Sequence, residues 1–226
     1  MAETLPIFPL NTVLLPGTAL PLHIFEPRYR QLTVDLMTGA VADRSFGVIA
    51  IRPGWSTEVN SLSQVHDVGC SALLRQAKRL PDGGFDIVTR GERRFRLLAL
   101  DAYSAPYLVG SVRWLPDSEP SGAIAEAVPV LSESARAAHR RYCGVAWQRE
   151  DWAEPGTDTD TMSLAHQIAA DCVLALEDRQ RLLEETNPLR RLRMVRRLLN
   201  RETGILNELR AVPASLFGLG SRPSRN

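Results

Sequence analysis

The hydrophobic periodicity of the chain changes once, near the segment Pro116-Asp117-Ser118-Glu119-Pro120. Before this segment, apolar residues come in short runs with a period of about two, which is typical of β-strands. After it they recur about every 3.6 residues, which is typical of helices. Strands in one half and helices in the other favour an α+β fold over a doubly wound sheet, in which the two alternate. We therefore expect a β-subdomain over residues 1–117, a helical bundle over 118–211 and a disordered tail over 212–226.

The first half is expected to form a small barrel. Proline and glycine divide its apolar residues into seven or more short strands. One helix is expected between Pro27 and Gly39, because proline suits the first helical position and glycine can end a helix with a positive φ. Leu80–Gly84 predicts a hairpin, and Gly91 predicts a bulge or a second turn. Many short strands and one helix favour a closed or half-closed β-barrel. The expected strands are Leu5–Leu10, Val13–Leu15, Ala19–Phe25, Phe46–Ile51, Gln64–Lys78, Phe85–Thr89, Arg93–Leu100 and Tyr107–Leu115.

The second half predicts helices. Residues 124–147 form one segment with a disturbance at Pro129, an apolar stripe runs from Ala165 to Leu176, and a short helix covers Asp178–Glu185. Asn187-Pro188 is expected to cap a last helix. Its buried face carries Leu192, Val195 and Leu199. The arginines that interleave with these leucines are expected to point outward as a solvated face, and they are Arg190, Arg191, Arg193, Arg196, Arg197 and Arg201.

The composition limits the classes of protein to which the chain can belong. A hydrophobic content of 44% and a net charge of +1 argue against a disordered chain and against a dedicated polyanion binder. Residues 5–25 are uncharged and long enough to span a bilayer, but four prolines break the run, so no membrane partner is expected. Cys70, Cys143 and Cys172 are three and far apart, which fits neither a disulfide framework nor a paired-thiolate metal site. We expect a reduced, cytoplasmic protein.

Sequence motifs of catalysis are missing. The chain has no P-loop, no Gly-x-Gly-x-x-Gly, no Gly-x-Ser-x-Gly, no His-Glu-x-x-His and no Cys-x-x-Cys. We therefore expect no catalytic residue, no cofactor and no metal. The acidic cluster of Asp151, Glu154, Asp158 and Asp160 lacks the spacing of a calcium loop and is interpreted as surface.

The four histidines are given structural interpretations. His23 is expected to face a partner or to be half-buried in a strand. His66 and the adjacent Asp67 should point to opposite faces of a strand, which argues against a His–Asp relay. His139 is expected to be solvated, and His166 to lie at the edge of the apolar stripe.

An ordered series of motifs resembles the N-terminal substrate-recognition domain of Lon proteases, which also occurs in stand-alone and cereblon-like proteins. This resemblance covers roughly residues 5 to 205 and implies a PUA-like β pseudo-barrel followed by a C-terminal α-helical bundle. The residues that carry it are Leu5-Pro6-Ile7-Phe8-Pro9-Leu10, Leu15-Pro16-Gly17, Pro21 to Tyr29, Phe46-Gly47-Val48-Ile49-Ala50, Val68-Gly69-Cys70, Leu80 to Gly84, Arg90 to Phe95, Gln180 to Glu184 and Arg191-Leu192.

The resemblance implies a non-catalytic module that recognises unfolded or extended polypeptide. In Lon proteases this region recognises unfolded or damaged protein, while an ATPase and a Ser–Lys dyad lie further along. We expect an adaptor or regulator that works with a protease or a chaperone in protein quality control. The surface residues expected to bind are His23, Phe25, Glu26, Arg28, Tyr29 and Trp55.

Two alternatives to polypeptide recognition stay open. One is nucleic-acid binding, to RNA above all, through the barrel and the arginine-rich helix; its affinity should fall steeply with salt. The other is a hydrolase with a non-standard site at His23 or His66, which requires a proton-transfer partner within hydrogen-bond reach of the imidazole.

Overall fold

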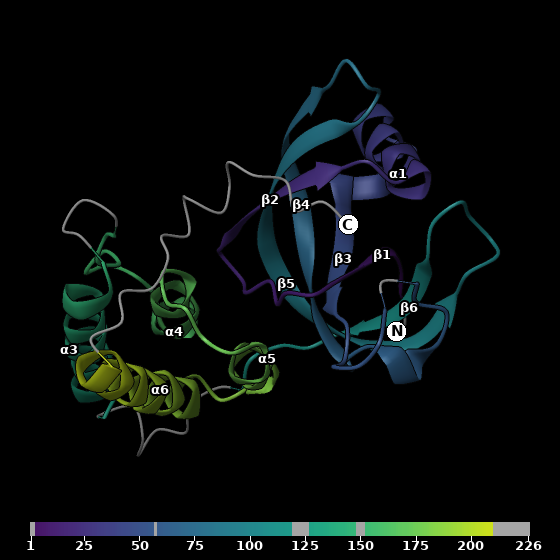
Figure 1. Cartoon of the computed structure of the whole chain (residues 1–226). Coiled ribbons are helices and arrows are strands. Elements are labelled where there is room, and N and C mark those ends of the chain that lie inside the picture. The colour runs from purple at the N-terminus through teal and green to yellow at the C-terminus, as the bar shows by residue number, and fades with distance from the viewer. Residues whose placement is uncertain (1–2, 57, 119–126, 148–151, 210–226) are drawn as a thin grey trace. The chain divides into compact units, whose positions relative to one another are not determined.

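The computed structural model describes residues 3–56, 58–118, 127–147 and 152–209 (Figure 1). The chain divides into two compact units, Met1–Pro116 and Asp117–Asn226. In the described ranges, the first unit has six strands and one α-helix, and the second has four α-helices. The fold class is therefore α+β, as the change in periodicity indicates.

Five strands of the first unit close into a ring. The sheet order is β2-β5-β4-β3-β1-β6, and β6 also pairs with β5, which closes the ring and leaves β2 outside it. β1 and β3 run parallel, and the other pairs are antiparallel. The strands are β1 Glu3–Leu10, β2 Ala19–Ile24, β3 Ser45–Ala50, β4 Val68–Arg79, β5 Phe85–Asp101 and β6 Val109–Trp114.

The 17-residue strand β5 belongs to the closed ring and also carries β2, the strand outside the ring. Its first half pairs with β2, and its second half pairs with β6. Cys70 pairs with Arg94 and Ala72 with Gly91, so β5 has one extra residue directly after Gly91; the expected bulge is present and the alternative, a second turn, is not. A Cβ on Gly91 would stand 2.3 Å from the Leu15 carbonyl oxygen, which shows how closely the two backbones approach.

The expectation of seven or more strands is wrong for the described residues. Val13–Leu15 is buried but forms no strand, because the chain after it turns onto Gly91: Gly17 N donates to the Gly91 carbonyl and Gly91 N to that of Thr18. Phe85–Thr89 and Arg93–Leu100, expected as separate strands, are parts of β5. Burial and strand pairing therefore diverge at Val13–Leu15, and periodicity alone does not separate them.

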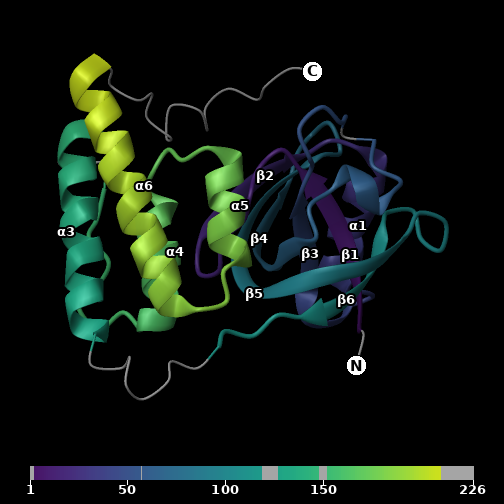
Figure 2. The same cartoon turned by 90° about the horizontal axis from the view of Figure 1, so that it is seen from below.

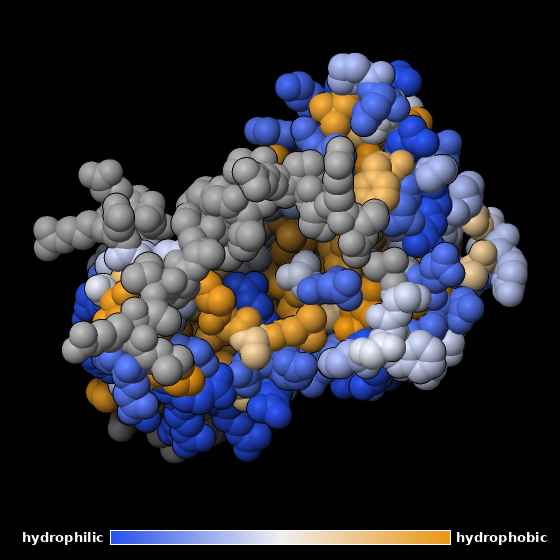
Figure 3. Space-filling view, viewed as in Figure 1, coloured by the Kyte–Doolittle hydropathy of each residue, from blue (hydrophilic) through white to orange (hydrophobic). Residues whose placement is uncertain are grey.

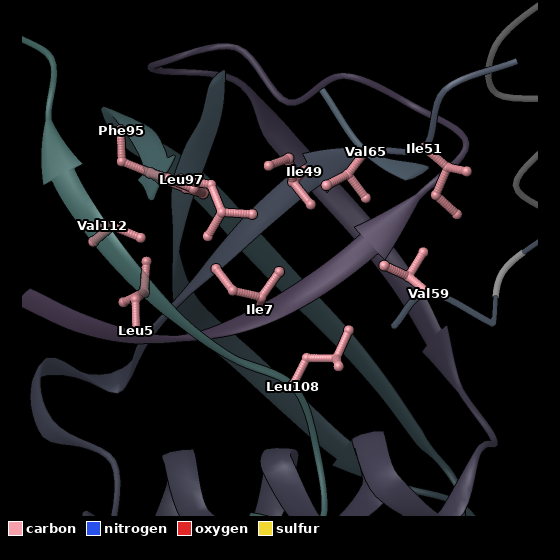
Figure 4. Packing of buried hydrophobic residues seen from close by; sticks show 10 residues of the cluster. All are labelled: Leu5, Ile7, Ile49, Ile51, Val59, Val65, Phe95, Leu97, Leu108 and Val112. Atoms are coloured by element: carbon pink, nitrogen blue, oxygen red, sulfur yellow. The ribbon is translucent and has the colours of Figure 1, made fainter. Parts of the chain in front are cut away.

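The interior of the barrel is filled by aliphatic side chains around one aromatic ring (Figure 4). Phe95 is fully buried, and a Cβ on Gly47 or Gly69 would lie only 2.8 or 2.5 Å from its Cζ atom. Gly47 on β3 and Gly69 on β4 therefore leave the space that the phenyl ring of Phe95 occupies. The buried cluster consists of Leu5, Ile7, Ile49, Ile51, Val59, Val65, Phe95, Leu97, Leu108 and Val112.

Helix α1, Pro27–Thr38, follows β2 directly. Pro27 lies in its first turn, and Gly39 ends it with a φ of 83°, as expected. Leu32 and Leu36 are buried. The unit also contains two 3-10 turns, η1 Ala42–Arg44 and η2 Leu62–Gln64.

The second unit is a bundle of α3 Val128–Ala146, α4 Thr161–Ala170, α5 Leu176–Glu184 and α6 Pro188–Leu209. Figure 2 shows α3 and α6 lying side by side. Leu192, Val195 and Leu199 are buried, and the Asn187 side chain accepts hydrogen bonds from the backbone of Leu189 and Arg190, so the expected face and cap of α6 are confirmed. Asp178–Glu185 was expected as a short helix, and α5 covers most of it.

Two helical expectations need correction. Pro129 lies in the first turn of α3, where its missing N–H leaves no intrahelical bond unmade, and so it does not interrupt the helix. Residues 124–126 of the expected segment lie outside the described residues. The stripe from Ala165 to Leu176 is not one helix, because α4 ends at Ala170 and α5 begins at Leu176.

One arginine of α6 points inward, contrary to expectation. Arg191 has no exposed surface, and its guanidinium donates to both carboxylate oxygens of Asp117 at 2.7 and 2.8 Å. It also donates to the backbone carbonyls of Glu185 and Met162. A planar guanidinium can serve all these acceptors at once, and this satisfies a buried charge.

We expect Gly69→Ala to lower the free energy of unfolding by about 2–3 kcal/mol, because its Cβ would stand 2.5 Å from both the Val48 carbonyl oxygen and the Phe95 ring. Urea denaturation followed by circular dichroism measures this. Gly144→Ala is the control, since nothing lies within 4 Å of that position and alanine favours a helix. Equal stability of the Gly69→Ala variant and the parent protein would contradict the tight packing.

We expect Arg191→Leu to destabilise the protein by about 3–5 kcal/mol, because it leaves the Asp117 carboxylate and two carbonyls without their donor. Arg190→Leu removes the exposed neighbour and should change stability by no more than about 0.5 kcal/mol. Thermal unfolding of the two variants compares them directly, and similar losses for both would count against a structural role specific to Arg191.

Candidate functional site

The junction between β2 and α1 brings together five of the six residues expected to bind. The strand ends at Ile24 and the helix begins at Pro27, so His23 to Tyr29 run from the end of β2 through a two-residue link into the first turn of α1. Trp55, the sixth residue, lies in the loop after β3 and is 51% exposed. Five of the six therefore lie on one short segment of the chain.

His23 is held by a carboxylate on the neighbouring strand. It stands opposite Asp86 in the register of β2 and β5, and its Nδ1 lies 2.8 Å from the Asp86 Oδ1. Both side chains are exposed, so the pair contributes little to stability. Its effect is to fix the orientation of the imidazole, whose ring also stacks on Phe25 at a centroid distance of 6.3 Å.

Glu26 and Arg28 form an ion pair at the start of α1. The Glu26 carbonyl accepts from the backbone of Arg30, and its Oε2 accepts from Arg28 Nε and NH2, both at 2.8 Å. The Arg28 guanidinium also lies 4.6 Å from the centroid of the Tyr29 ring, a cation–π contact. Both charged groups are half-buried, so this pair shapes the junction more than it offers free charge.

Tyr29 is not a surface residue, contrary to expectation. It is 2% exposed and stacks on Phe8 of β1 at a centroid distance of 3.7 Å. Burial raises the pKa of Tyr29 to about 12; the nearby Arg28 opposes this rise, and Glu26 adds to it. Its hydroxyl has no hydrogen-bond partner among the described residues. The ring therefore anchors α1 to the barrel, and its function is structural.

Phe25 is the exposed aromatic of the junction. It is 59% exposed and lies between the last residue of β2 and the first of α1. Val34 and Met37 of α1 are also partly exposed, and Figure 3 shows isolated hydrophobic side chains among hydrophilic ones over this helix. Apolar surface is thus available near the junction without forming a large continuous patch.

Strand β2 has one unpaired edge within the described sheet. It pairs only with β5, whose register sets Pro21 opposite Val88 and His23 opposite Asp86. Pro21 has no N–H to donate, which is the usual protection of an edge strand against uncontrolled pairing. On the exposed face of this strand lie Ala19, Pro21 and His23, and Phe25 follows them.

The hydrolase alternative requires a proton-transfer partner for His23 or His66. Asp86 gives His23 a carboxylate partner within hydrogen-bond reach, but neither Asp86 nor Phe25 supplies a hydroxyl or thiol nucleophile. Asp67, the sequence neighbour of His66, faces Arg52 and Arg96 at 3.0 and 3.9 Å. His66 and Asp67 lie before β4, which begins at Val68, so the expectation that both residues lie in a strand is wrong.

The described ranges contain neither a cluster of metal ligands nor a helix that could span a membrane. In residues 3–56, 58–118, 127–147 and 152–209, no group of three or more His, Cys, Asp or Glu side chains could hold a metal ion. Glu154 of the acidic cluster pairs with Arg140 at 2.6 Å, and Asp151 lies outside the described residues. No described helix combines the length and the apolar character needed to cross a membrane.

The structure changes the interpretation of two histidines and of the arginine face. His139, expected to be solvated, has no exposed surface, and His166 is also buried. On α6, Arg190, Arg193 and Arg197 remain exposed at helical spacing and form no ion pair with another described residue. The basic stripe is therefore narrower than the sequence suggests.

The comparisons with known proteins agree on one family. A family model described as the ATP-dependent protease La (LON) substrate-binding domain matches residues 4–201. Lon protease 2 of Myxococcus xanthus is 29% identical over 227 residues, which cover 99% of this chain and 26% of that protein. Lon protease 2 of Herpetosiphon aurantiacus is 30% identical over 207 residues, which cover 89% and 24%. The chain thus spans about a quarter of the length of these relatives.

Two solved structures share the fold. A Lon N-terminal domain protein from Xanthomonas campestris is 25% identical, with a TM-score of 0.57, over 93% of this chain and 99% of that one. The N-terminal domain of a Mycobacterium avium complex Lon protease is 21% identical, with a TM-score of 0.64, over 88% and 98%. The fold that the motif resemblance implies is therefore confirmed.

We expect Tyr29→Phe to change stability little at pH 7, because the deleted hydroxyl has no recorded partner, and to stabilise the protein at pH 11. Between pH 10 and 12 the tyrosine of the unfolded chain ionises while the buried Tyr29 of the folded protein stays neutral, because burial raises its pKa to about 12. Ionisation therefore favours the unfolded chain, and the free energy of unfolding falls as the pH rises through this range; below pH 10 it is unaffected. At pH 11 the parent protein should lose about 1.4 kcal/mol that the variant keeps.

Denaturant unfolding at the two pH values measures this difference. Tyr107→Phe is the comparison, because the Tyr107 hydroxyl donates to Asp35 at 2.9 Å and its loss should already cost about 1 kcal/mol at pH 7. Indistinguishable pH profiles of Tyr29→Phe and the parent protein would contradict the burial argument.

Proposed function

The chain belongs to the family of LON substrate-binding domains, and from that premise we propose that it is a non-catalytic module that recognises unfolded or extended polypeptide. The family supports substrate recognition as the general role. The observation that carries the finer proposal is the exposed Phe25 beside the unpaired edge of β2. Extended polypeptide needs backbone hydrogen bonds and a place for an apolar side chain, and these two features offer both.

The backbone of β2 would provide the first part of this recognition. An extended segment would add to β2 as a further strand and satisfy N–H and C=O groups that β5 does not use. Because backbone groups are the same in every sequence, such binding has low sequence specificity. Pro21 limits the number of donors that the edge can offer, which keeps the interaction short and reversible.

The exposed side chains would provide the second part. Phe25 can bury an apolar side chain of the client, and Val88, which lies opposite Pro21, adds apolar surface on the same face of the sheet. His23, Asp86 and Lys78 stand side by side on three adjacent strands and border this surface. The row includes the negative charge of Asp86 and the positive charge of Lys78. Charges of both signs favour general affinity for apolar segments over selection of acidic or basic ones.

We further propose that the chain acts in the cytoplasm as an adaptor or regulator for a protease or a chaperone. The relatives that match are named Lon proteases, which supports a role connected with proteolysis. Trp55 is proposed as a second, separate contact, because a half-exposed indole in a loop can serve as an anchor.

Binding of a labelled, permanently unfolded polypeptide, measured by fluorescence anisotropy at low and high salt, tests this function. We expect saturable binding that survives high salt, and Phe25→Ala should weaken it about fivefold to tenfold, or about 1–1.4 kcal/mol. Tyr103→Ala is the matched control, because Tyr103 is 96% exposed but lies in the loop between β5 and β6.

A labelled single-stranded RNA serves as the comparator for the basic stripe of Arg190, Arg193 and Arg197. RNA binding that disappears at high salt, with no binding of polypeptide, would replace the polypeptide proposal by a nucleic-acid one. Equal loss of polypeptide binding in Phe25→Ala and Tyr103→Ala would remove the β2–α1 junction as the site.

A further inference from the structure

Two cysteines far apart in the sequence meet in the helical bundle. Two hydrogen bonds join the end of α3 to the segment after α4: Val173 N donates to the Tyr142 hydroxyl at 3.0 Å, and Trp147 Nε1 donates to the Asp171 carbonyl at 2.9 Å. Cys143 follows Tyr142, and Cys172 lies between Asp171 and Val173. These two side chains hold the segment that carries Cys172 against the end of α3 that carries Cys143.

The two thiols are neighbours in the interior of the bundle. Each is close enough to shift the pKa of the other, and the Cys172 thiol donates to the Ile168 carbonyl at 3.2 Å. Both cysteines are free and buried, with exposures of 0% and 1%. Two reduced, neighbouring thiols on segments that are hydrogen-bonded to each other can form a disulfide without a large movement of the backbone.

The surroundings make the two thiols unequal. The neighbouring Cys172 and His139 lower the pKa of Cys143 against the effect of burial, while burial and the neighbouring Cys143 raise the pKa of Cys172. His139 lies four residues before Cys143 on the same face of α3, and its ring meets Trp152 edge-on at 5.4 Å. Cys143 therefore has the character of the attacking thiolate and Cys172 that of the resolving thiol.

Other charged groups support the segment that carries Cys172. Arg179 of α5 donates to the backbone carbonyls of Ala169, Ala170 and Cys172, which fixes the end of α4. Its positive charge also opposes the effects that raise the pKa of Cys172, whereas Asp171 adds to them. Cys70 lies in the barrel without a second cysteine beside it, and burial raises its pKa to about 12 against the opposing effect of Arg94.

We propose that Cys143 and Cys172 are a peroxide-sensitive pair that closes into an intramolecular disulfide between α3 and the segment following α4. This role goes beyond polypeptide recognition and does not depend on it. Hydrogen peroxide is the oxidant that suits the site, because the sulfurs are buried and larger disulfide reagents would require the bundle to open.

The reaction balances with one peroxide molecule. The Cys143 thiolate attacks one peroxide oxygen, so an S–O bond forms, the O–O bond breaks, and the departing hydroxide takes the proton that Cys143 released. The Cys172 sulfur then attacks the Cys143 sulfenic acid, an S–S bond forms, and the second hydroxide leaves with the proton of Cys172. Two thiols are oxidised by two electrons in total, and peroxide is reduced to two water molecules.

The test treats the full chain with hydrogen peroxide, alkylates the remaining thiols after denaturation, and maps the cysteine peptides by mass spectrometry. We expect a linked peptide pair containing Cys143 and Cys172, a mass lower by two hydrogens, and full reversal by dithiothreitol. Cys70 should remain alkylated. The cross-link should also raise the melting temperature of the bundle by about 10 °C.

Three variants separate the roles. Cys70→Ser should leave the cross-link unchanged. Cys143→Ser should abolish it, and Cys172→Ser should abolish it and leave a Cys143 sulfenic acid that dimedone traps. The peptide map of the parent protein decides the matter even if a variant fails to fold. Oxidation of Cys143 to a sulfinic acid with Cys172 still alkylated, or equal inertness of all three cysteines, would overturn the proposal.

Discussion

The contact between the Phe95 ring and two glycines holds the barrel closed. A small ring of five strands leaves little room inside, and one phenyl group fills it only where Gly47 and Gly69 present no side chain. Ile7 meets Gly110 in the same manner. These residues come from β1, β3, β4, β5 and β6, so each strand of the closed ring contributes one residue to this packing.

The closed ring also determines what remains available for binding. β5 is longer than the ring requires, and its first half carries β2 outside the closure, with one edge unpaired in the described sheet. Tyr29, stacked on Phe8, then fixes the direction in which α1 leaves this edge. The same packing that buries Tyr29 leaves Phe25, four residues earlier, exposed. The candidate site is thus a consequence of barrel closure.

Buried polar groups give the helical unit its specificity. Arg191 ties α6 to Asp117 and to two backbone carbonyls, and Arg179 ties α5 to the end of α4. Groups of this kind stabilise one arrangement of helices, because any other packing leaves a charge without partners in a medium of low polarity. His139 and the two bundle cysteines lie in the same interior. The proposed reactive thiols are therefore part of the packed interior of this unit.

The sequence by itself determined the fold class, the start and end of α1, the cap of α6 and the family, because periodicity, capping residues and ordered motifs are local properties. Tertiary structure alone decided that Val13–Leu15 is buried without being a strand, that Arg191 and His139 point inward, and that Tyr29 supports the site from within. It also decided that Cys143 meets Cys172 across 29 residues of chain. The physical reason is that burial and side-chain partners depend on segments distant in sequence, which no local pattern encodes.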